Sequence, residues 1–406
     1  MGLPGPARVA LPNPRPSSPL SPFYFLLSTF SFLLSTRATP AGRSPPSAVS
    51  WPGRSPGPRE SPFPSGRRRR HAGGMRSVAN PPNPWASTYV EWLGEPPPAR
   101  LAVYEEEARS VLSRNESPDI PFRWSVNPYR GCFHGCSYCY ARPSHQYLDL
   151  GAGSDFERRL VVKVNAPERL ARELARPGWR GEAIHFSGNT DCYQPLEASY
   201  GLTRRCLEVC LAADNPVTVV TKGQLVRRDA ELLARLAAGP GCRVVVSLAF
   251  LDAELSRALE PYAPAPAQRL ETLRHLAAAG VPVGVMVAPV APHLNDAAIP
   301  GILAAAREAG AETASLGCLR LPPEVAPLFR ERLAAVAPER AAAVLRGLAE
   351  VRGGRLDERR FGRRMAGEGP RWRLVEDLFR LHCRRLGLRP PEPPPPRGPR
   401  QGRLAL

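Results

Sequence analysis

Short apolar, β-branched runs alternate with amphipathic stretches between about residues 120 and 320, and this rhythm constrains the fold more than any other feature. The expected strands are about Arg123–Val126, Ala183–Phe186, Val217–Thr221, Arg243–Ala249, Val281–Ala288 and Glu312–Cys318. Strands that are buried on both faces read as continuous apolar runs, as most of these do. From the second strand onward, the strands start roughly 25 to 40 residues apart, which suits consecutive βαβ units.

Helices are expected between the strands, at about 168–176, 199–213, 229–238, 266–279 and 296–309. Two of them stop at Gly280 and Gly310, and glycine is favoured just past a helix end. Parallel strands with right-handed crossovers form either a barrel-like or an open doubly wound sheet, here with about six β/α units. In both architectures the loops after the carboxyl ends of the strands carry the chemistry.

A net charge of +18 would normally suggest a nucleic-acid partner. Here the positive charge is concentrated at the two ends of the chain, which weakens that inference. Residues 1–74 hold ten arginines and one glutamate, and the tail from Arg389 holds four arginines and one glutamate. Residues 75–388 therefore keep a net charge of only +6. This moderately basic core permits DNA binding but does not require it.

Both ends of the chain are predicted to be disordered, over residues 1–74 and 389–406, because such Pro- and Arg-rich segments bury too little apolar surface. The apolar run at 23–35 has 13 residues, whereas a membrane span needs about 20, so we expect no membrane partner. Ordered-looking sequence starts after Met75, which suggests translation from that residue.

Nine cysteines are present, and three of them fall within eight residues, at Cys132, Cys136 and Cys139. An odd number with most cysteines scattered singly is not a secreted disulfide framework, and it favours a reducing cytoplasm. Three thiolates this close predict a metal site. Zinc would need a fourth protein ligand, which His134 or His145 could supply. A cubane held by three cysteines would instead leave one iron open to a ligand.

The pattern C-x3-C-x2-C, with the aromatic Tyr138 directly before the last cysteine, resembles the signature of the radical S-adenosylmethionine (SAM) superfamily. The resemblance covers about residues 75–388 and implies a partial TIM barrel of about six β/α units with a C-terminal helical extension. It further implies a 4Fe–4S cluster on the three cysteines and SAM on the open iron, with the aromatic contacting the adenine. Reductive cleavage of SAM would then produce a 5′-deoxyadenosyl radical.

Three further loops fit this resemblance. Residues Ser187, Gly188, Asn189, Thr190 and Asp191 replace the family's usual Gly-Gly-Glu loop and are similar to the loop of the branch that includes spore photoproduct lyase. In that interpretation Thr190 or Asp191 accepts from the SAM ammonium group. Thr221, Lys222 and Ser247 lie at or just past strand ends; Thr221 or Lys222 is expected to reach SAM or substrate, and Ser247 the ribose or carboxylate of SAM. Without the cysteines, an Asx turn at Asn189 or Asp191 and a solvated surface lysine would be the preferred explanations of these residues.

Two more features carry open alternatives. Cys192, beside the proposed SAM loop, is either a catalytic hydrogen-atom donor or a passive core cysteine. Glu260 and Arg269 flank a Pro-rich turn, which fits a site role and a surface ion pair equally well.

The expected organisation is a radical SAM core over 75–322 and a helical extension over 323–388, whose segment 361–367 resembles a late motif of an uncharacterised bacterial subgroup. The substrate is unknown, and an external electron donor such as flavodoxin or ferredoxin is implied. The alternatives are a DNA photoproduct lyase, a zinc-stabilised binding module and an electron-transfer protein.

Overall fold

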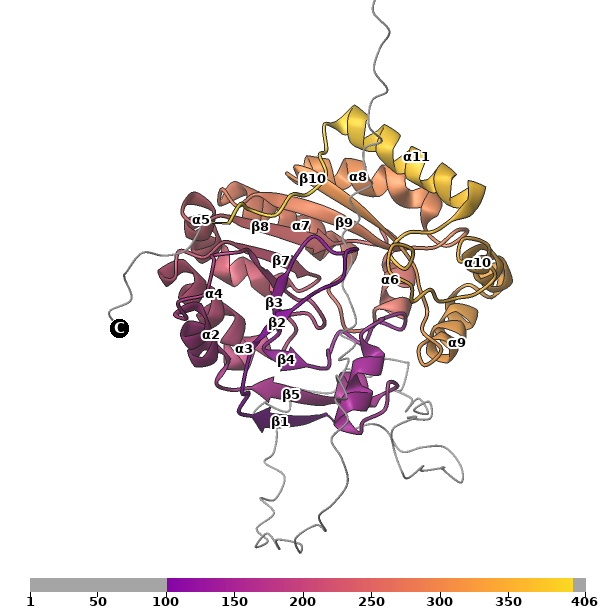
Figure 1. The fold of residues 1–406 in the computed structure, drawn as a ribbon. Helices are drawn as coiled ribbons and strands as arrows, with labels where there is room; N and C mark the ends of the chain where they lie inside the picture. The colour runs from indigo at the N-terminus through magenta and orange to yellow at the C-terminus, as the bar shows by residue number, and fades with distance from the viewer. Residues whose placement is uncertain (1–100, 397–406) are drawn as a thin grey trace, which may run out of the picture.

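The computed structural model describes residues 101–396, and a seven-stranded sheet forms their centre (Figure 1). Its strand order is β10-β9-β8-β7-β6-β3-β2. Six strands run parallel, and the short β2 (Leu112–Arg114) pairs antiparallel with β3 at one edge. The parallel strands are β3 (Trp124–Val126), β6 (Ile184–Phe186), β7 (Val217–Thr221), β8 (Cys242–Ser247), β9 (Val283–Val290) and β10 (Thr313–Cys318).

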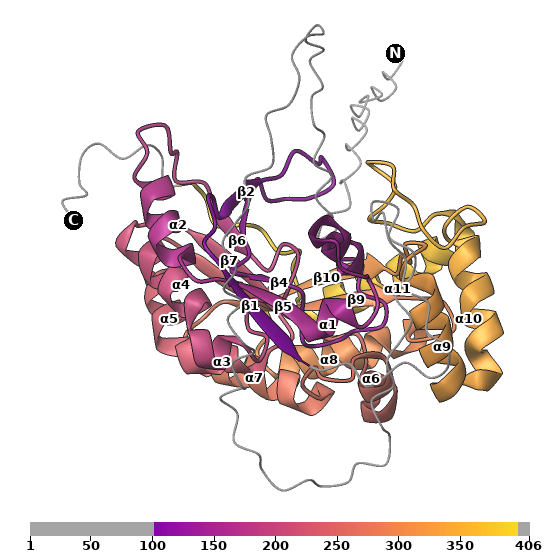
Figure 2. The ribbon, with the colours of Figure 1, turned by 90° about the horizontal axis from the view of Figure 1, so that it is seen from below.

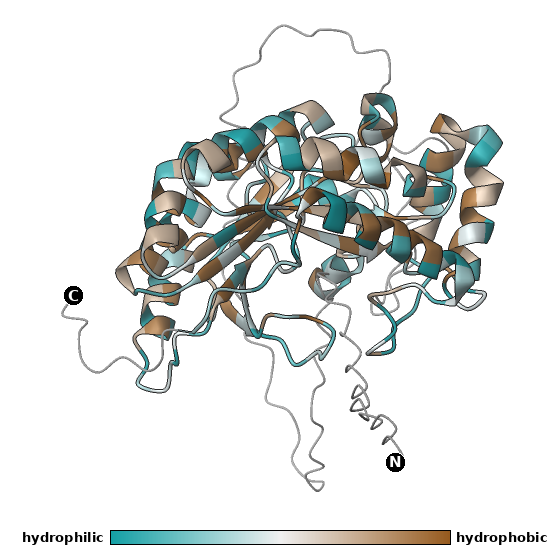
Figure 3. Ribbon diagram, turned by 90° about the horizontal axis from the view of Figure 1, so that it is seen from above, coloured by the Kyte–Doolittle hydropathy of each residue, from teal (hydrophilic) through white to brown (hydrophobic). Residues whose placement is uncertain are grey.

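Helices cover one face of this sheet and follow its curve (Figures 1 and 2). They are α2 (Ala166–Leu174), α4 (Leu202–Ala212), α5 (Ala230–Ala238), α7 (Pro266–Ala278) and α8 (Ile299–Glu308). The strands form a hydrophobic layer inside an arc of helices whose outer faces are more polar (Figure 3). Every residue of β7 and β10 is buried, which is why their sequences carry no alternation. Because the two edge strands do not pair with each other, the barrel is partial.

The structure confirms the predicted six-unit α/β architecture, and it corrects two helices. The helix expected over 199–213 is split at Gly201, whose φ of +60° ends α3 (Glu197–Tyr200) and precedes α4. The helix expected over 296–309 begins as a 3₁₀ turn, η3 (Asp296–Ala298), before α8 starts. A second 3₁₀ segment, η2 (Gln224–Asp229), precedes α5.

A second, three-stranded sheet was not predicted from the sequence. Its order is β1-β5-β4, formed by β1 (Ala102–Glu106), β5 (Arg159–Lys163) and β4 (Tyr129–Arg130). The strands are short and come from three distant parts of the chain, so local periodicity marks none of them clearly. The cysteine loop continues directly from β4, and η1 (Arg142–Leu148) and α1 (Asp155–Arg158) complete the connection to β5.

Four further helices are not among those that cover the face of the sheet. They are α6 (Ala253–Leu259), α9 (Ala326–Val336), α10 (Pro338–Glu350) and α11 (Gly369–Leu386). The last three lie within the predicted extension 323–388, α9 lies against α6, and α11 lies against α8. Arg389, where the predicted disordered tail begins, pairs with Thr313 of β10 through two backbone hydrogen bonds to its neighbours.

The predicted disordered segment 1–74 and the suggested start at Met75 lie outside the described residues, as does the end of the tail. Among residues 101–396, no helix combines the length and apolar character that crossing a membrane requires.

Candidate active site

A cavity with about 920 Å³ of empty space, its mouth included, lies at the carboxyl ends of the parallel strands. This is the edge where an α/β sheet places its chemistry. Most of the residues singled out in the sequence line it: Cys132, Cys136, Tyr138, Cys139, Ser187, Asn189, Thr190, Asp191, Thr221, Lys222 and Ser247. Gly188 and Cys192 do not. The fold therefore brings together residues from four separate strand ends.

The cysteine loop is wrapped around a buried arginine that sequence reasoning missed. The guanidinium of Arg142 donates to the carbonyl oxygens of Gly135 at 2.8 Å, Cys136 at 2.9 Å and Gly153 at 2.7 Å. It also forms an ion pair with Glu157 at 2.6 Å. Only the position of this arginine, three residues after the last cysteine, could have hinted at the role.

Glycine is required at the first turn of this loop. Gly131 has a φ of +75°, and a Cβ atom there would stand 2.7 Å from the His145 ring, the Leu160 side chain and the Phe156 carbonyl oxygen. The Cys132 backbone N–H donates to the same Phe156 carbonyl at 2.9 Å. The loop is thus held tightly against α1 just where its first cysteine enters the cavity.

The three thiols face the cavity from a poorly solvated environment. Burial raises the pKa of each, that of Cys136 to about 12, and the neighbouring cysteines raise the pKa of Cys132 further. A bound metal removes such a proton outright, because its charge replaces the missing solvation. Three buried thiols side by side therefore fit the ligands of a metal cluster better than three protonated cysteines.

The two histidines considered as zinc ligands behave differently. The Nδ1 atom of His134 lies 3.4 Å from Asp191 at the cavity. His145 does not line the cavity, and its Nε2 contacts the Arg159 carbonyl oxygen at 2.8 Å. Among residues 101–396, no three His, Cys, Asp or Glu side chains are gathered tightly enough to hold a single metal ion. A cubane allows a wider spacing of its ligands, because each cysteine binds a different iron.

Tyr138 is anchored through its hydroxyl group, which donates to Glu260. Glu260 is fully buried and forms an ion pair with the equally buried Arg269. Burial would raise the pKa of Glu260, but the charges of Arg269 and Lys222 lower it below its usual range. The alternative of a surface ion pair is therefore wrong, and the pair fixes the aromatic ring of the cysteine motif instead.

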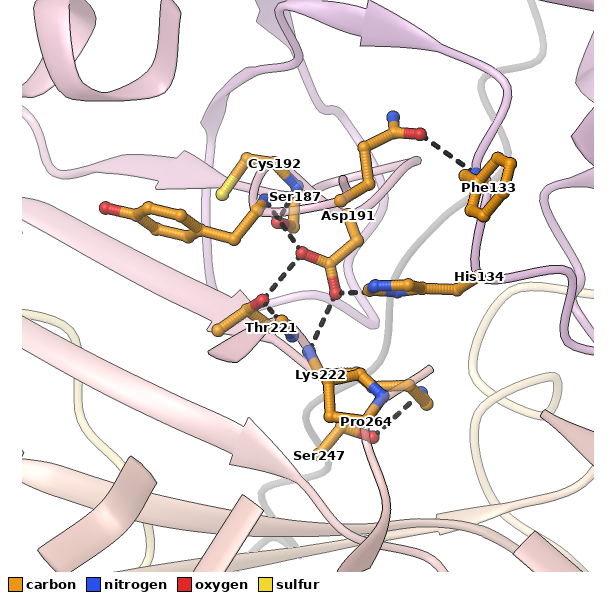
Figure 4. Close-up of polar contacts among 12 residues, drawn as sticks. Phe133, His134, Ser187, Asp191, Cys192, Thr221, Lys222, Ser247 and Pro264 are labelled. Atoms are coloured by element: carbon orange, nitrogen blue, oxygen red, sulfur yellow. Dashed lines mark hydrogen bonds and ion pairs between the residues drawn. The ribbon is translucent and has the colours of Figure 1, made fainter. Parts of the chain in front are cut away.

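Asp191 joins the loops around the cavity (Figure 4). Its Oδ1 accepts from the Thr221 hydroxyl at 2.6 Å and from the Tyr193 N–H at 2.9 Å. Its Oδ2 accepts from the Lys222 N–H at 2.7 Å and faces His134 at 3.4 Å. Burial tends to raise the pKa of Asp191, but the bonds from His134, Thr221 and Lys222 lower it to about 2. Both oxygens are already occupied, so this carboxylate holds loops in place.

Both side-chain oxygens of Asp191 accept hydrogen bonds, whereas the side-chain oxygen of Asn189 accepts none among the described residues. Ser144 donates its hydroxyl hydrogen to Ala141 at 2.6 Å, so its oxygen must accept from the Asn189 side-chain N–H at 3.1 Å. This fixes the orientation of the amide. The Asn189 Oδ1 is buried at the cavity and has no hydrogen-bond partner among the described residues. Thr190 donates its hydroxyl to the Tyr129 carbonyl oxygen at 2.8 Å.

Lys222 and Ser247 form a second polar group at the cavity. The Lys222 Nζ donates to the Ser247 hydroxyl at 3.0 Å and lies 3.9 Å from Glu260. The same ammonium group stands 6.0 Å from the centre of the Tyr138 ring. Lys222 is therefore part of the site and not the solvated surface lysine that the sequence also allowed.

Gly188 and Cys192 shape the loop from behind the cavity. A Cβ atom on Gly188 would approach Ser125 of β3 at 3.0 Å, so the loop packs closely on the first parallel strand. Cys192 is buried in the main hydrophobic core, and its N–H donates to the Ser187 hydroxyl at 2.9 Å (Figure 4). The catalytic role of Cys192 stays a prediction, and its location favours packing.

The cavity also has lining residues that the sequence did not single out as site residues, namely Tyr140, Val220, Met286, Ala288, Pro289, Cys318, Leu319, Arg320 and Met365. Met365 lies in the 361–367 segment already noted in the sequence. Cys318 ends the last parallel strand, and Leu319 and Arg320 follow it, so the rule that strand ends carry the site could have identified them.

Part of the chain is similar to a known protein family. Residues 126–306 match the model of the radical SAM superfamily. An uncharacterized protein of Mycobacterium tuberculosis is 43% identical over 197 residues, which are 48% of this chain and 58% of that protein. An uncharacterized protein of Methanocaldococcus jannaschii is 24% identical over 49% of this chain and 71% of its own length. The chain thus spans little more than half of the mycobacterial relative.

The solved structures extend the match to the fold. Spore photoproduct lyase with bound AdoMet and dinucleoside spore photoproduct superposes with a TM-score of 0.52, at 17% identity, over 71% of this chain and 81% of that one. A point variant of the same lyase gives a TM-score of 0.53 at 16% identity, with the same coverage. These likenesses show the fold, and the family match makes residues 126–306 similar to the radical SAM superfamily, whose members use a 4Fe–4S cluster and SAM.

Proposed function

We propose that the protein cleaves SAM reductively at a 4Fe–4S cluster held by Cys132, Cys136 and Cys139, and acts on a substrate that is still unknown. The observation that carries the proposal is that the three thiols, the Tyr138 ring and the 187–191 loop all face one cavity. Such a cluster would supply the electron for breaking the C5′–S bond of SAM and, with it, the radical chemistry that acts on the substrate.

The protein's own part is to hold SAM in one orientation. The free Asn189 Oδ1 supports a role as acceptor for the SAM ammonium group, while Asp191 positions the loop. This changes the sequence-based expectation that Thr190 or Asp191 accepts from that group. Tyr138, fixed by Glu260, presents its ring for the adenine, and Lys222 with Ser247 presents polar groups for the carboxylate or ribose. Such preorganised contacts lower the entropic cost of reaching a reactive geometry.

An external one-electron donor belongs to this proposal, because a 4Fe–4S cluster must be reduced before SAM is cleaved. Flavodoxin or ferredoxin would serve, and both fit a reducing cytoplasm. None of the six cysteines outside the motif forms a metal site with other ligands among the described residues.

Anaerobic reconstitution tests the proposal directly. Protein given iron and sulfide should turn brown, absorb near 400 nm and form 5′-deoxyadenosine from SAM when dithionite is added. The Cys136→Ala variant should do neither, while its folding is checked by circular dichroism. A colourless wild-type protein would favour zinc or no metal, and a brown one that leaves SAM intact would favour electron transfer.

Repair of a DNA photoproduct is the second candidate, favoured by the fold shared with spore photoproduct lyase. At 16–17% identity, that likeness supports the fold, and the activity is an analogy. If DNA is the substrate, affinity for duplex DNA should fall steeply with salt, because phosphate contacts release counterions. Binding that is absent, or independent of salt, would argue against this candidate.

A further inference from the structure

The cysteine loop encloses an ion pair to which the proposed cofactor site assigns no role. The side chain of Arg142 is 1% exposed, and it lies 2.6 Å from the carboxylate of Glu157, whose side chain is 14% exposed. Neither residue lines the cavity, so the pair contacts the cysteine loop from outside the cavity. Because little water surrounds the guanidinium, its charge is screened far less than that of a surface arginine.

The guanidinium is bound mainly to backbone groups. It donates to the carbonyl oxygens of Gly135 and Cys136 in the loop, and to that of Gly153. The backbone N–H of Arg142 donates to the Cys139 carbonyl oxygen at 3.2 Å. One buried cation is therefore attached to the loop next to its second cysteine and directly after its third.

The charge of Arg142 acts on the sulfur atoms of the motif. Burial raises the pKa of the Cys139 thiol, whereas a hydrogen bond from Ala141 and the charge of Arg142 lower it. A cation that favours negative charge on this sulfur also favours an added electron on a cluster that the sulfur binds, because both place negative charge in the same region. Net charge and hydrogen bonds around a cluster are among the factors that set its reduction potential.

Other charged groups near the motif belong to the cavity side. Lys222 and Asp191 line the cavity, and Glu260 lies 3.9 Å from Lys222. Their effect on a cluster is expected to change when SAM enters the cavity. Arg142 and Glu157 lie outside the cavity lining, so their effect can be measured without SAM.

We propose that Arg142 is a positioning residue that holds the cysteine loop and raises the reduction potential of the cluster bound there, and that Glu157 limits this increase. The inference rests on the proposed function in assuming that cluster. Its reduction takes one electron from the external donor, breaks no bond and makes the cluster more negative by one charge. The buried guanidinium stabilises that reduced state, so a weaker donor suffices, and the carboxylate of Glu157 opposes the effect.

The test is a redox titration of the anaerobically reconstituted full-length chain, without SAM, in which EPR measures the reduced cluster. Arg142→Gln should lower the midpoint potential by about 59 mV, which is a tenfold change in the ratio of reduced to oxidised cluster for one electron. Glu157→Gln keeps an acceptor oxygen for Arg142 but removes the negative charge, so the potential should rise. Arg142→Lys keeps the positive charge and should lie closer to wild type than Arg142→Gln.

Opposite shifts separate an effect of charge from damage to the loop, because a disturbed loop gives no reason for shifts of opposite sign. Arg159→Gln is the matched control and should leave the potential unchanged, since that arginine is 43% exposed and lies 4.0 Å from Asp155. If Arg142→Gln takes up no cluster, Glu157→Gln decides alone. An unchanged or lower potential in Glu157→Gln overturns the inference and leaves the proposed function intact. A wild-type protein without a cluster overturns both.

Discussion

The two ends of the cavity are built in opposite ways. At the cysteine end, one short loop supplies the three thiols and Tyr138, and Arg142 ties that loop together through its carbonyl groups. At the other end, Tyr140, Arg320 and Met365 come from segments that are far apart in the chain. The first end is formed by a contiguous sequence motif, whereas the second is formed by residues that only the complete fold brings together.

The two ends can also be compared by their hydrogen bonding. Around the cysteine loop, Asp191 has partners on both oxygens, and Tyr138 is fixed by Glu260. At the other end, the Tyr140 hydroxyl has no partner among the described residues. Each end therefore keeps one buried polar atom without a partner among the described residues, the Asn189 Oδ1 near the cysteine loop and the Tyr140 hydroxyl at the opposite wall.

The largest effect is expected from removing one cysteine of the motif. In Cys136→Ala, 5′-deoxyadenosine formation should fall at least about a hundredfold, because the cluster loses one of its three thiolate ligands. Iron content and absorbance near 400 nm measure the cluster, and chromatography measures the product. Cys383→Ala, on α11 and outside the cavity, serves as the matched control and should retain both. Equal activity in the two variants would contradict the assignment of Cys136 as a ligand of the cluster.

Asp191→Asn should be next in size. The new amide would place a donor against the N–H groups or hydroxyl that now donate to the carboxylate, at a cost of about 1–3 kcal/mol in unfolding free energy. Thermal or denaturant unfolding measures this loss. Asp377→Asn, in an exposed ion pair on α11, should change stability by less than about 0.5 kcal/mol. If both variants unfolded alike, Asp191 would not be the hub of the cofactor end.

The same carboxylate predicts a pH dependence. Its pKa is lowered to about 2 in the folded protein against an ordinary value of 3.8, so the unfolded state binds the proton more readily. The stabilisation, about 2 kcal/mol, should be fully present above about pH 4 and should disappear as the pH falls toward 2. Denaturant unfolding from pH 5 to pH 2 should therefore show a steeper acid loss for wild type than for Asp191→Asn. Parallel curves would contradict the assignment.

Asn189→Ala should have a smaller effect that is limited to SAM. Loss of one acceptor for an ammonium group should weaken SAM binding by about tenfold, while cluster content stays unchanged. Equilibrium dialysis under anaerobic conditions measures the affinity. Asn189→Asp keeps an oxygen in place and should recover most of the binding. An unaltered affinity in the alanine variant would return the acceptor role to Thr190 or a backbone group.

The smallest effect is expected for Cys192→Ala. The side chain is packed in the core and does not line the cavity, so SAM cleavage should stay within about twofold of wild type. Cys318→Ala, whose residue does line the cavity, is the matched comparison once a substrate is known. A large loss of turnover in Cys192→Ala alone, with SAM cleavage retained, would restore the hydrogen-donor hypothesis.

The barrel and the cysteine motif could be predicted from the sequence alone. Strand β7 occupies the predicted range Val217–Thr221, and the other parallel strands lie within about two residues of their expected bounds. Apolar runs and glycine at helix ends are local signals, because they depend only on residues that are close together in the sequence. The three cysteines and Tyr138 were recognisable for the same reason, since all their spacing lies within one loop.

The buried polar contacts and the small sheet could not be predicted from the sequence. Glu260 and Arg269 became a buried anchor for Tyr138, Asp191 became a loop hub, and Arg320 reached the cavity. The small sheet β1-β5-β4 pairs strands that are short and distant in sequence. Burial and hydrogen-bond partners of such residues depend on contacts between distant segments, and no periodicity within one segment records them.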